Sequence, residues 1–176
     1  MATTKRGQTI KMTTTGVVKK GRIKVMAIEV VPNAAGDTAT FGTYFSGDKD
    51  SSVRGAVITS VASGVVTSTG NFTSTNIDTG DVVEIVYASD KNSNVSFLAT
   101  RDNDNQITAS PIEDLTDETT SVWDFDVYTP SQELIVTCDA TTGADTPQTT
   151  YLNGRWFNNL TLTALSTSAV VYIYFE

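Results

Sequence analysis

The sequence lacks several residues on which common chemistries depend. It contains no histidine, the most frequent general base and metal ligand. Its single cysteine, Cys138, excludes an intrachain disulfide framework and any cysteine-rich zinc or iron–sulfur site. Long hydrophobic runs are also missing, and the longest, 169–175, is too short for a membrane span or a secretory signal. We therefore expect a protein made in the cytoplasm, without a cofactor and without membrane contact.

Hydroxyl-bearing residues are abundant instead, with 30 Thr and 15 Ser among 176 residues. Threonine is β-branched and suits the half-exposed surface of a strand. In segment 121–128 the apolar Trp123, Phe125 and Val127 alternate with Asp124 and Asp126, a period typical of strands. The same reasoning predicts strands over 38–45, 56–61, 81–87, 133–138, 160–165 and 169–175. No window of 11 residues has apolar residues at the spacing of an amphipathic helix. Segment 112–118 allows one helical turn at most.

Turn signals separate these strands. Asn153-Gly154 is the sharpest, because a two-residue type I′ turn needs positive φ at both positions, so it predicts a hairpin. Residues 166–168 are expected to join a terminal hairpin whose final strand is buried on both faces. About ten short strands without helices predict an all-β fold, an antiparallel β-sandwich of jelly-roll type, with an immunoglobulin-like sandwich as the alternative. We expect a basic arm or first strand over 1–24 and a single domain over 25–176.

The charge of the chain is unevenly distributed. The first 24 residues contain seven basic residues and no acidic one, whereas the chain as a whole has a formal charge of −8. Such a segment is either an arm for an acidic partner or the solvent face of a first strand that prevents edge aggregation. An acidic protein surface is the expected partner, because the acidic remainder of the chain would repel nucleic acid. With Trp156, these residues form the predicted partner-binding set: Lys5, Arg6, Lys11, Lys19, Lys20, Arg22, Lys24 and Trp156.

Two groups of acidic residues are candidates for chemical sites. Asp124 and Asp126 share a strand face, and two carboxylates are the minimum for glycoside hydrolysis, yet alternating acids are ordinary on a solvated face. The run Asp102–Gln106 resembles the start of an EF-hand loop, but Ile107 stands where that loop requires glycine. A hairpin tip explains the run better. Serine and cysteine nucleophiles lack a histidine base, so we predict no catalytic and no metal site, and a core position for Cys138.

The aromatic residues are mostly expected in the core. Among Trp123, Trp156, Phe157, Tyr172 and Tyr174, alternation assigns most to strand interiors. Trp156 follows the Asn153-Gly154 turn and is the aromatic residue least firmly assigned to the core, with a subunit contact as its alternative position.

Two stretches together resemble a known family. Segment 22–34 is similar to the opening strand and Pro-Asn turn of small β-sandwich virion proteins of tailed bacteriophages, and segments 156–163 and 169–176 are similar to their closing hairpin. The resemblance covers about a third of the chain and is one of pattern. The segment 46–150 is longer than that family leads us to expect.

The resemblance implies a non-enzymatic capsid decoration or cement protein on the capsid exterior. Its expected partners are the major capsid protein and other copies of this chain, as a homotrimer. The rival interpretation is a carbohydrate- or receptor-binding module of a tail fibre or spike, with Trp156 or the Asp102/Asp104 loop as its site.

Overall fold

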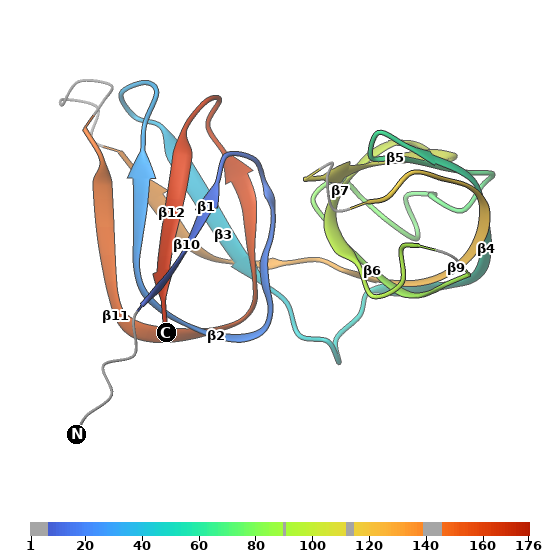
Figure 1. The fold of residues 1–176 in the computed structure, drawn as a ribbon, viewed down its shortest axis with the longest axis horizontal. Coiled ribbons are helices and arrows are strands. Elements are labelled where there is room, and N and C mark those ends of the chain that lie inside the picture. The colour runs from blue at the N-terminus through green and yellow to red at the C-terminus, as the bar shows by residue number, and fades with distance from the viewer. Residues whose placement is uncertain (1–6, 90, 112–114, 139–145) are drawn as a thin grey trace. The chain divides into compact units, whose positions relative to one another are not determined.

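The computed structural model describes residues 7–89, 91–111, 115–138 and 146–176, and these residues form strands and no helix (Figure 1). No described element is a helix able to cross a membrane. The all-β antiparallel sandwich predicted from the sequence is confirmed. The part of segment 112–118 that is described, from Leu115, holds no helical turn, and 112–114 lie outside the described residues.

The chain divides into two compact units, where the sequence led us to expect one domain over 25–176. Unit 1 contains the residues before Tyr44 and after Pro130, and unit 2 is Tyr44–Pro130. Each unit has its own apolar core, and the two cores share no residue. Most of the additional length noted at 46–150, up to Pro130, is therefore an inserted unit with an interior of its own, and the rest belongs to unit 1.

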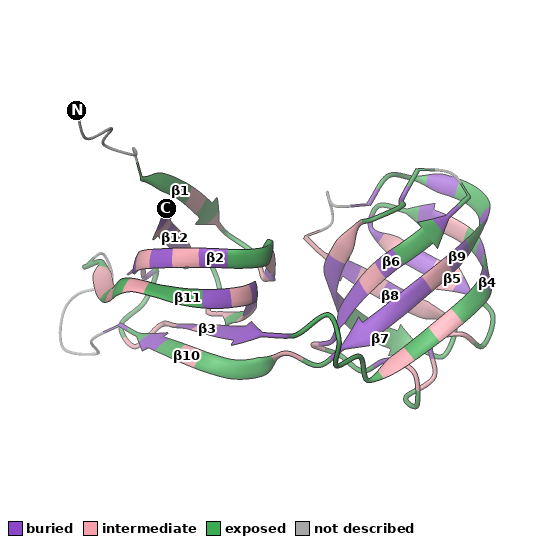
Figure 2. Cartoon of the chain, turned by 90° about the horizontal axis from the view of Figure 1, so that it is seen from below, coloured by how far each residue is buried: buried purple, intermediate pink, exposed green. Residues whose placement is uncertain are grey.

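Unit 1 is a six-stranded antiparallel sheet that folds over into two layers. Its strand order is β1-β12-β2-β11-β3-β10. Figures 1 and 2 show the long strands β2 and β11 bending, so that β1 and β12 lie on one side of the core and β3 and β10 on the other. Phe41, Val136 and Ile173 meet in that core. The strands are β1 (Gln8–Met12), β2 (Gly16–Val31), β3 (Thr38–Thr43), β10 (Ser131–Thr137), β11 (Gln148–Leu165) and β12 (Val170–Phe175).

The fold in the sheet coincides with two residues of positive φ. Gly21 in β2 has φ +77°, and Asn159 in β11 has φ 46°. The backbone N–H of Gly21 donates to Oδ1 of Asn159 at 2.7 Å. The register between β2 and β11 also shifts on either side of Leu160. This irregularity lets both strands turn the corner together, because a bulge bends a strand and increases its twist.

Both predicted hairpins near the C-terminus are wrong. Asn153 and Gly154 do have positive φ, but they form a bulge inside β11 between Tyr151 and Arg155. The strands β11 and β12 are joined by a turn at 166–169, yet β12 pairs with β1 and β2. The end of β11 lies in the other layer, beside β3, so the turn carries the chain across the core. Strand β12 is accordingly buried on one face only.

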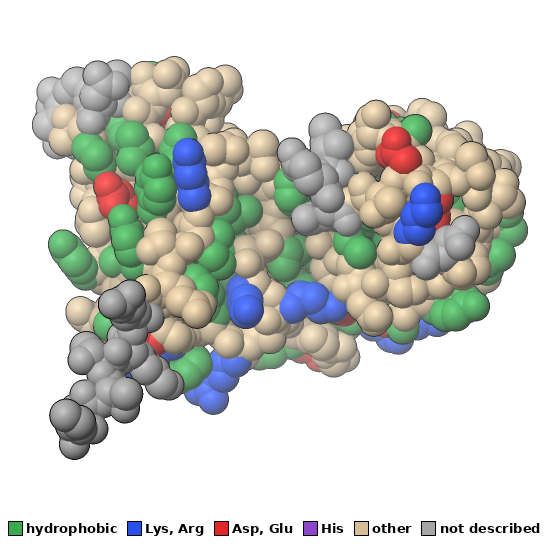
Figure 3. Space-filling model, in the orientation of Figure 1, with side chains coloured by type: hydrophobic (Ala, Val, Ile, Leu, Met, Phe, Trp, Pro, Cys, Tyr) green, Lys and Arg blue, Asp and Glu red, His purple; other side chains and the backbone are tan. Residues whose placement is uncertain are grey.

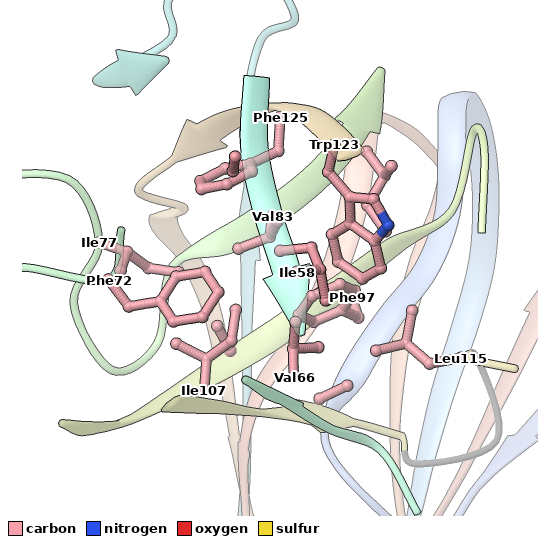
Figure 4. Packing of buried hydrophobic residues seen from close by; sticks show 14 of the residues in the cluster. Ile58, Val66, Phe72, Ile77, Val83, Phe97, Ile107, Leu115, Trp123 and Phe125 are labelled. Atoms are coloured by element: carbon pink, nitrogen blue, oxygen red, sulfur yellow. The ribbon is translucent and has the colours of Figure 1, made fainter. Parts of the chain in front are cut away.

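Unit 2 is a closed antiparallel barrel with the strand order β4-β5-β8-β7-β6-β9, in which β9 pairs again with β4. Its core is built from alternate residues of each strand and is completed by Phe72 and Ile77 from the segment that joins β5 to β6 (Figure 4). Trp123 and Phe125, predicted to share one face of a strand, are both buried there. The strands are β4 (Ser51–Ala62), β5 (Val65–Ser68), β6 (Val82–Ala88), β7 (Ser96–Asn103), β8 (Gln106–Ser110) and β9 (Glu118–Tyr128).

Candidate interaction face

The outer face of β12, β2 and β11 carries large aromatic side chains. Strand register places Tyr174 opposite Ala27 and Ala27 opposite Tyr151, so a small residue lies between two tyrosines in one row. Tyr172 lies opposite Glu29, and Trp156 opposite Lys24. Residues opposite each other in a ladder project to the same side. The outward position of this row therefore follows from the inward position of its neighbours Val171, Ile173 and Phe157.

Three basic side chains lie among these aromatic rings. Lys11 of β1 is opposite Tyr172. Arg22 and Lys24 are alternate residues of β2 and project from its outer side. Figure 3 shows hydrophobic side chains gathered on this side of unit 1, with charged residues among them. Tyr151 is 75% exposed and Trp156 is 51% exposed. We call this surface the aromatic–basic face, made of Lys11, Arg22, Lys24, Tyr151, Trp156, Tyr172 and Tyr174.

The basic groups of the face are held in place by contacts within unit 1. The guanidinium carbon of Arg22 lies 4.3 Å from the centroid of the Trp156 ring. Lys24 Nζ is 2.6 Å from Oε2 of Glu176, and Lys11 Nζ is 6.0 Å from the Tyr172 centroid. Each contact of this kind contributes about 0.5–1 kcal/mol at an exposed site. They pre-order the side chains more than they stabilise the fold, which lowers the entropic cost of binding.

Two carboxylates lie on this face: Glu176, which is ion-paired with Lys24, and Glu29, which lies opposite Tyr172. The hydroxyl of Tyr174 donates to Oε2 of Glu29 at 2.7 Å. This hydrogen bond, together with burial and the negative charge of Glu29, raises the pKa of Tyr174. The hydrogen bond ties the Tyr174 side chain of β12 to Glu29 of β2, in the row that also contains Ala27.

The structure brings together four members of the predicted partner-binding set and separates the others. Lys11, Arg22, Lys24 and Trp156 belong to the aromatic–basic face. Lys19 and Lys20 are exposed beside Gly21, where β2 bends. Lys5 and Arg6 lie outside the described residues. From Gln8 onward the basic segment is part of the sheet, which agrees with the first-strand alternative and not with a free arm.

Sequence reasoning missed Tyr151, Tyr172 and Tyr174 as surface residues. The sequence predicts Tyr172 and Tyr174 in a strand interior and the final strand buried on both faces, and both predictions are wrong. The available signal was the alternation of these tyrosines with Val171, Ile173 and Phe175, which does predict one outward row. Tyr151 precedes the Asn153-Gly154 bulge, and the bulge obscured its strand.

The acidic groups weighed as chemical sites are engaged within the barrel. In the loop after β7, Arg101 forms an ion pair with Asp104, and Oδ2 of Asp102 accepts from the Thr108 hydroxyl at 2.8 Å. Among the described residues no group of three or more acidic, cysteine or histidine side chains could hold a metal ion. Asp124 accepts from the Gly55 N–H at 2.7 Å.

The second member of the predicted acidic pair, Asp126, is buried and not solvated. Its carboxylate accepts hydrogen bonds from Ser52 at 2.7 Å and from Arg54 at 2.6 Å. Burial raises its pKa, but these hydrogen bonds and the charges of Arg54 and Lys49 outweigh burial and lower the pKa overall. These contacts link Asp126 in β9 to Ser52 and Arg54 in β4. Cys138 is buried in the core of unit 1, as predicted, and its pKa is raised by burial and then by the charge of Asp37.

Comparison of the chain with protein-family models, curated proteins and solved structures finds no match.

Proposed function

We propose that this chain is a non-enzymatic structural protein of a tailed-bacteriophage virion, and within it a capsid decoration or cement protein. It would lie on the capsid exterior and bind the major capsid protein and other copies of itself, in a homotrimer. The observation that carries the proposal is the aromatic–basic face, a pre-ordered protein-contact surface on the strands that show the family resemblance. These strands, β12, β2 and β11, are neighbours in one sheet.

The composition of the face supports contact with protein. Tryptophan, tyrosine and arginine are the residues most enriched where binding energy concentrates in protein interfaces. The positive charges on it favour an acidic partner surface. In an assembly with many copies, each contact can be weak because attachment is multivalent.

Carbohydrate binding is the second candidate, and the exposed ring of Trp156 favours it. A sugar would stack on an aromatic face, but the Arg22 guanidinium already lies over the Trp156 ring. A glycan ligand would have to use the other side of that ring, or Tyr151. Contact with protein is therefore the better explanation.

Mass spectrometry of purified virions of the encoding phage tests the proposal. We expect the chain in the particle at a fixed copy number relative to the major capsid protein. The double variant Arg22→Glu with Trp156→Ala should lower its occupancy on particles at least tenfold, because it removes a cation and the largest ring of the face. Thr167→Ala, an exposed change in the turn after β11, is the control and should keep full occupancy.

Absence of the chain from purified particles would refute the proposal, and so would specific binding of a glycan that depends on Trp156.

Deleting the first 20 residues, which contain many of the basic side chains, would not test the role of their charge alone. It would remove β1, whose Met12 packs on the core of unit 1, and would disturb the fold together with the charge.

A further inference from the structure

The barrel carries an exposed apolar patch of its own. Val57 of β4 lies opposite Val122 of β9, and Tyr87 of β6 lies opposite Asp124 of β9. The exposed fractions are 53% for Val57, 40% for Val122 and 55% for Tyr87, and Val86 beside Tyr87 is 48% exposed. We call Val57, Val86, Tyr87, Val122 and Asp124 the aliphatic–acidic patch. It spans three adjacent strands, and contiguous apolar surface of this kind marks interaction sites.

The two units differ strongly in charge. Unit 1 contains eight basic and six acidic residues, a net charge of +2. The barrel contains four basic and fourteen acidic residues, a net charge of −10. Two barrels therefore repel each other, whereas a barrel is attracted to the basic face of a unit 1.

Local charges agree with this division. Close to the patch, the cations Arg54 and Lys49 are both within ion-pair distance of Asp126, at 2.6 and 3.5 Å. Asp124 belongs to the patch itself, and its hydrogen-bond donor there is the Gly55 backbone. An apolar area beside an acidic residue is the counterpart of aromatic rings beside Lys11 and Arg22. The third cation of the face, Lys24, is ion-paired with Glu176. Electrostatic complementarity of this kind selects partners and fixes their register.

We propose that copies of this chain associate head to tail. The aromatic–basic face of one copy packs against the aliphatic–acidic patch on the barrel of the next copy. This inference rests on the proposed function only in taking the face as a contact surface, and it names the partner of that face as a second copy. A contact between two different surfaces is heterologous, so it closes into a ring or continues as a chain.

Sedimentation velocity of the purified full-length chain tests this without any virion. The wild type should form oligomers at about 100 μM, and their dissociation constant should rise about tenfold between low and high salt, because surface charges are screened. Two variants each lose one surface: Arg22→Glu with Trp156→Ala destroys the face, and Tyr87→Ser with Val122→Asp destroys the patch. All four side chains are exposed, and circular dichroism verifies that each variant is folded.

Mixing the two variants is the decisive measurement. Each variant alone should be a monomer. An equimolar mixture should form dimers and nothing larger, since it offers one intact face and one intact patch per pair. The controls Thr167→Ala and Asp102→Asn should assemble like the wild type.

A wild type that stays monomeric up to 100 μM, or a mixture that stays monomeric, would overturn the inference. Assembly that survives loss of the face and strengthens with salt would also overturn it, because it indicates barrel–barrel contact. The two proposals fail separately. A chain that is monomeric in solution but present in virions overturns the head-to-tail contact and leaves the capsid-binding part of the proposed function intact. A self-assembling chain absent from virions overturns the proposed function and leaves the head-to-tail contact intact.

Discussion

A single buried carboxylate organises one end of the barrel. Glu118 begins β9 and is buried, and its Oε1 accepts from the Ser121 hydroxyl at 2.7 Å and from Trp123 Nε1 at 3.0 Å. Its Oε2 accepts from the backbone N–H of Lys91 at 3.2 Å. Burial alone raises its pKa, but the donors, including the Asn92 side chain, outweigh burial and lower the pKa of Glu118.

We predict that Glu118→Gln destabilises the barrel by about 2 kcal/mol, the usual value for hydrogen bonds to a charged group. A glutamine keeps one acceptor for Ser121 and Trp123 but sets an N–H₂ group against the Lys91 N–H. Denaturant unfolding followed by Trp123 emission, in a Trp156→Phe background, measures the change. Asp48→Asn, an exposed carboxylate on the same unit, should change stability by less than about 0.5 kcal/mol.

The pH dependence of that difference has a definite sign. Because the folded pKa of Glu118 is lowered, the ionised group contributes stability at neutral pH that is lost as pH falls through the folded pKa. The gap between wild type and Glu118→Gln should be full above about pH 5 and shrink below about pH 4. A gap that is constant from pH 7 to pH 3 would contradict the assignment.

At the scale of the elements, the bends of β2 and β11 convert one sheet into two layers. The bend needs Gly21 at φ +77°, with its N–H on the Asn159 side chain. No heavy atom lies within 4 Å of a Cβ built on Gly21. The demand for glycine is therefore conformational and not a matter of space.

We predict that Gly21→Val destabilises unit 1 by about 1–3 kcal/mol, because a β-branched residue is strained in the left-handed region. Gly21→Asn should lose less stability, since asparagine tolerates the left-handed region. Far-ultraviolet circular dichroism during thermal unfolding measures both. The control is Gly47→Ala, which also has open space at Cβ and no left-handed φ, and it should be close to neutral. Equal losses for valine and asparagine would refute the conformational explanation.

At the scale of the whole molecule, the barrel is an insertion between two neighbouring residues of unit 1. Ser131 is the register partner of Thr43, so β3 and β10 are adjacent where the chain leaves and re-enters unit 1. At the corresponding points of the barrel, the Tyr44 and Tyr128 rings stack with centroids 4.9 Å apart. In each unit, the chain segments at the connection to the other unit thus contact each other, and each unit has a core of its own.

We predict that the two units unfold independently. The chain has two tryptophans, Trp123 buried in the barrel and Trp156 exposed on unit 1, so each unit carries its own probe. In a Trp156→Phe background, Gly21→Val should lower the unfolding midpoint seen by circular dichroism for unit 1. The midpoint of Trp123 emission should stay within error. Equal shifts in both signals would show that the units form one cooperative system.

The sequence by itself determined the class of fold, because a period-two pattern requires strands and needs no long-range information. Trp123, Phe125 and Val127 are buried as their alternation indicated, and the absence of helical stripes matches the absence of helices among the described residues. The basic character of β1 and β2, and Trp156 as a contact candidate, were likewise visible in the order of residues alone.

Only the tertiary structure decided which strands are neighbours. Asn153-Gly154 has the positive φ that its sequence demands, but whether such a pair makes a hairpin or a bulge depends on the strand pairing beyond it. The division into two units was hidden for the same reason, since local patterns on both sides of Tyr44 are alike. The aromatic–basic face joins Lys11, Arg22, Tyr151 and Tyr172 from four strands, and only long-range hydrogen bonding between strands could bring them together.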